Sequence, residues 1–127
     1  MNPDRRTFFA FCTSAAYAIV LMVFLLLPSD SLPKIKILSV DKIWHFLSYF
    51  ILTLALMFSF REGRYRIWFS RRWSFIIAMI HGGLTEILQG FIPGRSAGMD
   101  DWIANCLGIA TAILGFKLFP KFFEKQK

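Results

Sequence analysis

Long uninterrupted apolar runs dominate the chain. Four of them are long enough to cross a bilayer, because a hydrocarbon core of about 30 Å needs roughly 17–25 helical residues. These runs cover residues 8–27, 43–60, 73–92 and 102–119. Their apolar positions do not recur at the amphipathic spacing of soluble helices. The pattern predicts an all-α polytopic membrane protein, in which residues 1–127 form one four-transmembrane-helix bundle.

Proline, glycine and acidic residues mark the expected helix ends. Pro28 is expected to end the first helix, and Pro93-Gly94 the third. An acidic side chain before an apolar run is a common N-cap. Asp41 is therefore the expected N-cap of the second helix, and Asp100 or Asp101 that of the fourth.

Basic residues are divided unequally between the two ends of this bundle. The chain carries a formal net charge of +7. A four-span topology puts eleven of the 15 Lys and Arg residues on the side of both termini. Only Lys34, Lys36, Lys42 and Arg95 lie on the opposite side. The positive-inside rule then predicts that both termini are cytoplasmic. The basic excess therefore indicates topology and attraction to membrane lipid, and nucleic-acid binding is not expected.

Polar side chains gather where the spans should meet the outer surface. A charged side chain at membrane depth costs about 2.5–3.5 kcal/mol on insertion scales, so such residues are rarely accidental. The i, i+4 spacing places Asp41 and His45 on one stripe of the second helix. Asp101 and Asn105 share a stripe of the fourth. The sequence thus predicts a shallow, outward-facing ligand pocket lined by Asp41, Lys42, His45, Glu86, Gln89, Arg95, Asp101 and Asn105.

Glu86 is the most demanding member of this set. A carboxylate buried in an apolar span must be protonated or find a cation. The candidate cations are Arg95, Lys42 and His45, and only Arg95 offers a planar fork that grips a carboxylate bidentately. A Glu86–Arg95 pair that merely fastens the hairpin is the structural alternative to a ligand site.

Two further polar features have simpler interpretations. His81 lies near the expected midplane, where a neutral imidazole hydrogen-bonded to a neighbouring helix is expected. A metal site built from Asp41, His45, Glu86 and Asp101 lacks the compact ligand spacing of known metal motifs. The sequence therefore predicts neither a metal nor a cofactor.

Small residues recur every four positions in the fourth run, at Ala104, Gly108 and Ala112. Such spacing lets two helix backbones approach closely. We expect this face to pack within the bundle, with homo-oligomerisation through the same face as the alternative.

In combination, three motifs resemble the VanZ-like family of small bacterial integral membrane proteins. They are Asp41-Lys42-x-x-His45, Glu86-x-x-Gln89-x-x-x-Pro93-Gly94-Arg95 and Asp101-x-x-x-Asn105-x-x-Gly108, within about residues 41–115. The resemblance implies a multi-pass protein of the bacterial cytoplasmic membrane, associated with the cell envelope. It also implies kinship with a namesake that confers resistance to the glycopeptide teicoplanin. It implies no reaction.

Three functions stay open on these grounds. The first is a pocket that binds an anionic or amphiphilic envelope ligand, such as a lipid headgroup, a lipid-linked precursor or a glycopeptide-type drug. The second is an enzyme acting on an envelope lipid or cell-wall precursor, with Glu86 as acid/base and His45 or Asp101 as its partner. The third is a structural subunit of a membrane assembly.

Overall fold

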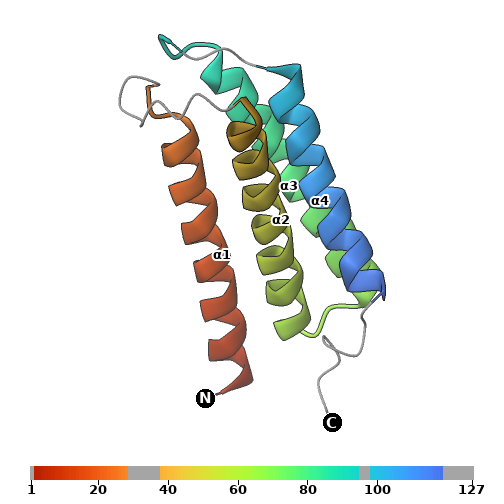
Figure 1. Ribbon diagram of the computed structural model, residues 1–127. Helices are drawn as coiled ribbons and strands as arrows, with labels where there is room; N and C mark the ends of the chain where they lie inside the picture. The colour runs from red at the N-terminus through yellow and green to blue at the C-terminus, as the bar shows by residue number, and fades with distance from the viewer. Residues whose placement is uncertain (1, 29–37, 95–97, 119–127) are drawn as a thin grey trace.

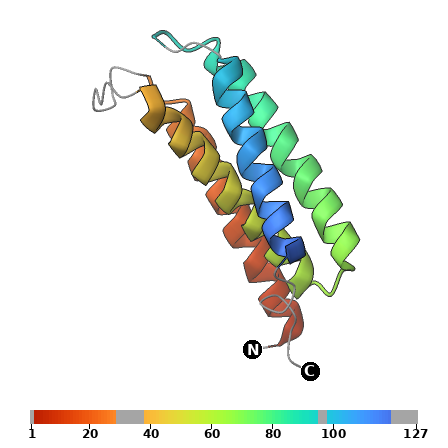
Figure 2. The ribbon, with the colours of Figure 1, turned by 45° about the vertical axis from the view of Figure 1, so that its right-hand side comes forward.

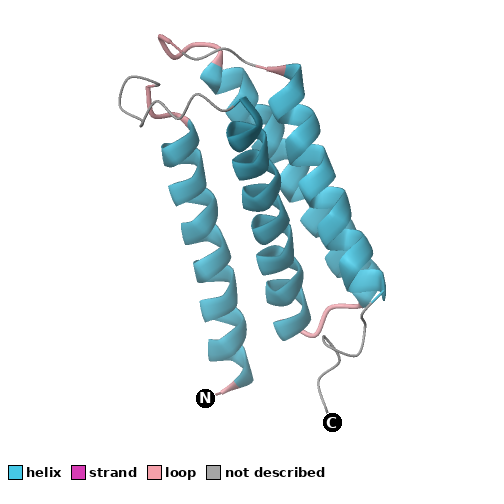
Figure 3. Ribbon diagram, viewed as in Figure 1, coloured by secondary structure: helices cyan, strands magenta, loops and turns pink. Residues whose placement is uncertain are grey.

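Four α-helices lie side by side, and successive helices alternate in direction, in the computed structural model of this protein (Figures 1 and 2). The structure describes residues 2–28, 38–94 and 98–118. The helices are α1 (Pro3–Leu25), α2 (Leu38–Glu62), α3 (Ile67–Gln89) and α4 (Met99–Leu118). Figure 3 shows helices and loops but no strand in these ranges. The predicted all-α class is confirmed.

The helix ends differ in detail from those expected. Because α2 begins at Leu38 and α4 at Met99, Asp41, Asp100 and Asp101 lie in first helical turns. The predicted N-cap roles are therefore wrong, although acidic side chains in a first turn still interact favourably with the helix dipole. The third helix ends at Gln89, before Pro93-Gly94. The chain then turns, and Gly94 adopts a φ of 78° that an L side chain rarely takes.

Three of the four helices are long and apolar enough to cross a membrane. They are α1, the part of α2 from Asp41 to Glu62, and α4. The α3 helix, which covers residues 73–89 of the predicted span 73–92, is not among them. Its sequence includes Arg71, Arg72, His81 and Glu86, and these polar residues lower its mean hydropathy. A multi-pass membrane protein is therefore indicated, with three candidate spans.

The α2 helix lies at the centre of the bundle and packs against the other three helices. Its contact with α4 is the most extensive, and Gly108 explains how the two backbones come so close. A Cβ atom at Gly108 would collide with the backbone carbonyl of Phe46. Ala104 and Ala112 are buried on the same face of α4. The expected packing of this small-residue stripe within the bundle is confirmed.

Candidate functional site

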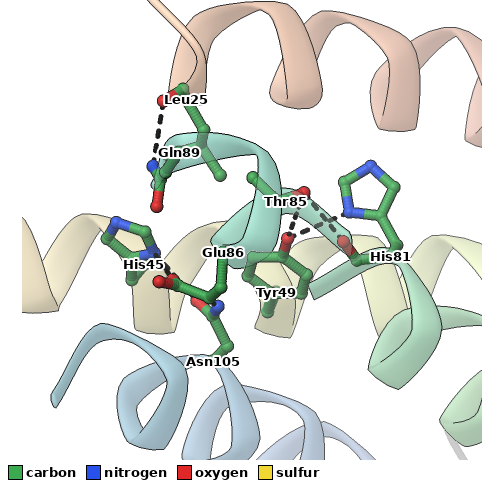
Figure 4. A network of polar contacts seen from close by, with 8 residues as sticks. All are labelled: Leu25, His45, Tyr49, His81, Thr85, Glu86, Gln89 and Asn105. Atoms are coloured by element: carbon green, nitrogen blue, oxygen red, sulfur yellow. Dashed lines mark hydrogen bonds and ion pairs between the residues drawn. The ribbon is translucent and has the colours of Figure 1, made fainter. Parts of the chain in front are cut away.

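One polar side chain from each of α2, α3 and α4 meets the others inside the upper end of the bundle (Figure 4). His45 and Asn105 are fully buried, and the side chain of Glu86 is 9% exposed. The Nδ1 atom of His45 lies 2.9 Å from Oδ1 of Asn105. The Nδ2 atom of Asn105 donates to Oε1 of Glu86 at 3.4 Å, and this oxygen is also 3.9 Å from His45 Nδ1.

The amide of Asn105 fixes the roles of these atoms. Its NH₂ group can only donate, and it faces the carboxylate of Glu86. Its oxygen can only accept, so His45 must donate from Nδ1 to it. In the neutral imidazole the lone pair then resides on Nε2. This chain of contacts orients His45 with Nε2 as the acceptor, as outer partners of a ligand histidine do.

Three buried atoms of this site have no hydrogen-bond partner among the described residues. They are His45 Nε2, Glu86 Oε2 and Gln89 Oε1. All three are acceptors in the arrangement just given, whereas buried polar atoms are normally paired. In Figure 4, Nε2 is on the side of the imidazole away from Glu86 and Asn105. The site therefore offers unused acceptors to a hydrogen-bond donor or a cation.

Two of the predicted acidic residues join His45 at the end of the bundle. Asp41 is exposed and Asp101 is partly buried. One ligand atom of each carboxylate and one nitrogen of His45 all lie within 4.8 Å of one another. The i, i+4 stripes predicted on two helices thus do converge, because α2 and α4 are held close together at Gly108.

Lys42 is placed differently from the sequence-based expectation. Lys42 was a candidate partner of Glu86, but its Nζ pairs with Oδ2 of Asp100 at 2.7 Å on the surface. Glu86 instead contacts His45 and Asn105. Lys42 therefore lies beside the buried network rather than inside it. Arg95, the other predicted partner of Glu86, lies outside the described residues.

A second polar chain runs deeper along the same helices. The hydroxyl of Tyr49 lies 2.9 Å from His81 Nδ1 and donates to Thr85 at 3.3 Å. The other nitrogen of His81 lies 3.0 Å from the carbonyl of Ala18 in α1. The prediction that His81 bonds to neighbouring helices is confirmed (Figure 4).

The α1 helix contributes to the site through its backbone. Gln89 donates to the carbonyl oxygen of Leu25 at 2.9 Å, and His81 contacts that of Ala18. Sequence reasoning did not identify either carbonyl, because every residue has one and no side chain marks those that will be used.

The family profile described as VanZ/LLP1 matches residues 11–120. This chain belongs to the VanZ/LLP1 family. The match covers all the residues of the buried network and its surface neighbours.

A fission yeast relative of this VanZ/LLP1 chain is also found. It is the Schizosaccharomyces pombe protein named Uncharacterized protein C11E3.10, which is 33% identical over 82 residues. The alignment covers 64% of this chain and 49% of the yeast protein, so the chain spans about half the length of the curated relative. The bacterial origin expected from the sequence stays a prediction. No solved structure matches this chain.

Two shallow surface grooves flank the site of the VanZ/LLP1 chain. One lies between α3 and α4, with Glu86 among the lining residues Gly83, Glu86, Ile87, Gly98, Met99 and Trp102. The other lies between α2 and α4 and combines the Lys42–Asp100 pair with apolar residues. Each groove places charge beside a mainly apolar wall, which is a surface suited to an amphiphile.

Proposed function

We propose that this protein is a four-span membrane protein whose polar site binds an amphiphile with a phosphate-bearing headgroup that carries hydroxyl or ammonium donors. The single observation that carries the proposal is the set of unpaired buried acceptors on His45, Glu86 and Gln89. A network that served only to fasten helices would be expected to satisfy its own members, because unpaired buried polar atoms are destabilising. A bound headgroup with hydroxyl or ammonium donors supplies the missing partners.

The surface of α3 supports its assignment as the fourth span. Ile80, Leu84 and Ile87 have exposed fractions of 65%, 46% and 62%. A face this apolar is favourable against lipid and unfavourable against water. The polar residues Ser74, Thr85 and Glu86 of the same helix are buried inside the bundle. The α3 helix thus has the inside-out polarity of a helix that contacts lipid.

The α3–α4 groove supports the amphiphilic character of the ligand. Its walls include Ile87 and Trp102, while Glu86 reaches it from the buried network. An acyl chain fits the apolar side and a headgroup the polar end. With both termini cytoplasmic by the positive-inside rule, this end of the bundle faces outward in a cytoplasmic membrane. The ligand is then an outer-leaflet lipid or a lipid-linked precursor.

Two glycines give a matched test. A Cβ atom at Gly83 or at Gly115 would meet nothing within 4 Å, so a side chain can leave the backbone without collision at either position. Of these two glycines, only Gly83 lines the α3–α4 groove. Gly83→Leu should fill the groove, whereas Gly115→Leu makes the same change in α4 away from it.

The measurement is native mass spectrometry of gently extracted protein supplemented with phosphatidylglycerol, whose headgroup carries both a phosphate and hydroxyl donors. Wild type and Gly115→Leu should retain one lipid, and Gly83→Leu should retain it at least about tenfold less (about 1.4 kcal/mol). Equal retention by Gly83→Leu and Gly115→Leu would overturn the proposal.

The family kinship with a teicoplanin-resistance protein extends the proposal to glycopeptide-type drugs at the outer face. The test is the inhibitory concentration of teicoplanin for a bacterial host that expresses the chain. Wild type and Gly115→Leu should raise this concentration and Gly83→Leu should not. If wild type gives no rise, the extension is wrong and lipid binding is unaffected.

A second candidate function, an enzyme acting on the bound lipid, is favoured by the position of Glu86. Its carboxylate lines the groove, has one oxygen without a partner among the described residues, and contacts His45. A carboxylate so placed is suited to act as a general acid or base.

A further inference from the structure

The buried network and the two acidic stripes end at the same imidazole. Asn105 engages Nδ1 of His45, and the opposite nitrogen, Nε2, is buried without a partner among the described residues. Asp41 and Asp101 each place a carboxylate oxygen within 4.8 Å of a nitrogen of this ring and of each other. One imidazole and two carboxylates therefore converge from two helices.

We propose that Asp41, His45 and Asp101 bind a divalent transition-metal ion, with His45 coordinating through Nε2. Metal bonds of about 2.0–2.2 Å place ligand atoms roughly 3–3.5 Å from one another. The present separations of up to 4.8 Å can therefore be closed by a side-chain rotation. Asp41 is exposed in the first turn of α2, so its side chain can rotate to complete the set.

The contacts behind the imidazole match those of a metal ligand. A coordinating histidine usually donates its other N–H to an oxygen acceptor, which fixes the tautomer and raises basicity. Asn105 accepts from His45 in this way, and Glu86 in turn accepts from Asn105. The negative charge of Glu86 thus acts on the metal site through Asn105, without Glu86 being a ligand.

The local charges also favour a bound cation. Neither Asp41 nor Asp101 forms an ion pair with any residue in the described ranges, and the nearby Lys42 is occupied by Asp100. Two carboxylates and Glu86 would repel an anionic headgroup, whereas a divalent ion would neutralise them and attract phosphate oxygens. A metal ion here would explain how the site holds the phosphate of the lipid headgroup. The metal site rests on the proposed function only for this phosphate, which would complete the coordination of the ion.

The donor set narrows the identity of the metal. Oxygen-only sites suit Mg²⁺ and Ca²⁺, while an imidazole among carboxylates suits ions such as Mn²⁺ and Zn²⁺. Three protein ligands leave at least one position open, as in catalytic rather than structural sites. Water or a phosphate oxygen would fill that position.

Two exposed aspartates provide a matched pair of variants. Asp41→Asn removes a proposed ligand, and Asp4→Asn makes the same chemical change in the first turn of α1, outside the cluster. Both positions are exposed, so neither change disturbs the core. His45→Gln removes the imidazole itself, but it also alters the buried network.

The test titrates Mn²⁺ alone into chelator-treated, detergent-solubilised protein, with no phospholipid added, and follows free Mn²⁺ by electron paramagnetic resonance. Wild type and Asp4→Asn should bind one ion per chain with equal affinity, and Asp41→Asn at least about tenfold more weakly. Bound Mn²⁺ should also show electron spin echo modulation from an imidazole nitrogen, which should be absent in His45→Gln.

Equal affinities of Asp41→Asn and Asp4→Asn, or no saturable binding by wild type, would overturn the metal site. Saturable binding without nitrogen modulation would overturn the assignment of His45 as a ligand. Because the titration contains no added lipid, its failure is separate from failure of the lipid-retention experiment. Zn²⁺ that does not displace Mn²⁺ from wild type would contradict the mixed nitrogen and oxygen ligand set.

Discussion

The Nδ1 atom of His45 lies 2.9 Å from the side-chain oxygen of Asn105, a contact between residues 60 positions apart in the sequence. This contact joins α2 to α4, and the NH₂ group of Asn105 continues it to Glu86 in α3. One amide therefore connects three helices. Its two ends must serve a donor and an acceptor at once, so no apolar side chain can replace it.

We expect Asn105→Leu to destabilise the bundle by about 1–3 kcal/mol. The substitution leaves His45 Nδ1 and Glu86 Oε1 buried without their hydrogen bonds to Asn105. Reversible unfolding in mixed detergent micelles measures the change. Thr111→Val is the control, because Thr111 is exposed in α4 and bonds only within its own helix. A loss no greater in Asn105→Leu than in the control would contradict the connecting role of the amide.

Gly108→Ala should destabilise the protein by about 1–3 kcal/mol, as overpacking in a close-packed interior does. The added methyl group would collide with the backbone of Phe46, and backbone cannot move as cheaply as a side chain end. Gly115→Ala is the matched change in the same helix, where a Cβ meets nothing within 4 Å. It should be neutral or stabilise by up to about 1 kcal/mol through helix propensity. The same unfolding assay compares the two variants, and equal effects would mean that α2 and α4 do not approach closely here.

Glu86→Gln separates the two candidate functions. Gln keeps the size of the side chain and its acceptor for Asn105 but cannot transfer a proton. If the protein only binds lipid, neither wild type nor Glu86→Gln should convert a lipid chemically. If Glu86 is a general acid or base, turnover of a lipid substrate should fall by at least about 10²-fold while binding survives. Chemical conversion that persists in Glu86→Gln would exclude this role for the residue.

Membrane orientation is testable with single cysteines at exposed loop positions of the structure. Arg66 lies between α2 and α3 and Pro93 lies after α3, at opposite ends of the bundle, and both are exposed. With Cys12 and Cys106 replaced by Ala, a membrane-impermeant maleimide should label Pro93→Cys in intact cells and Arg66→Cys only after permeabilisation. The reverse pattern would show that the polar site faces the cytoplasm. Labelling of both positions in intact cells would place them on the same side of the membrane. That result would contradict α3 as a membrane span.

The polar site shows which contacts could be predicted from the sequence and which could not. The spacing of Asp41 and His45, and of Asp101 and Asn105, correctly placed each pair on one helical stripe, because helical periodicity is local. The partners of Glu86 were harder to predict, although His45 was among the candidates and does lie 3.9 Å from it. Lys42 was a reasonable candidate by charge, yet it pairs with Asp100 on the surface. Sequence spacing within one helix carries no information about which side chain of another helix will face it.

The proposed metal site likewise could not be predicted from sequence spacing. In the sequence, Asp41, His45 and Asp101 lack the compact spacing of a metal motif, because the third residue is 56 or more positions from the other two. Helix packing brings their ligand atoms within 4.8 Å of one another. The availability of Nε2 depends in turn on Asn105, whose side chain occupies the opposite nitrogen.

The sequence by itself determined the all-α class, three apolar spans and the end of the bundle at which polar residues gather, since apolar run length and helical periodicity depend only on neighbouring residues. Only the tertiary structure decided that Asn105 stands between His45 and Glu86, and that α1 supplies backbone acceptors to His81 and Gln89. The physical reason is the close approach of α2 and α4 at Gly108, which sets the rotation and depth of each helix against the next. Those two quantities fix which polar atoms are paired and which are left for a ligand.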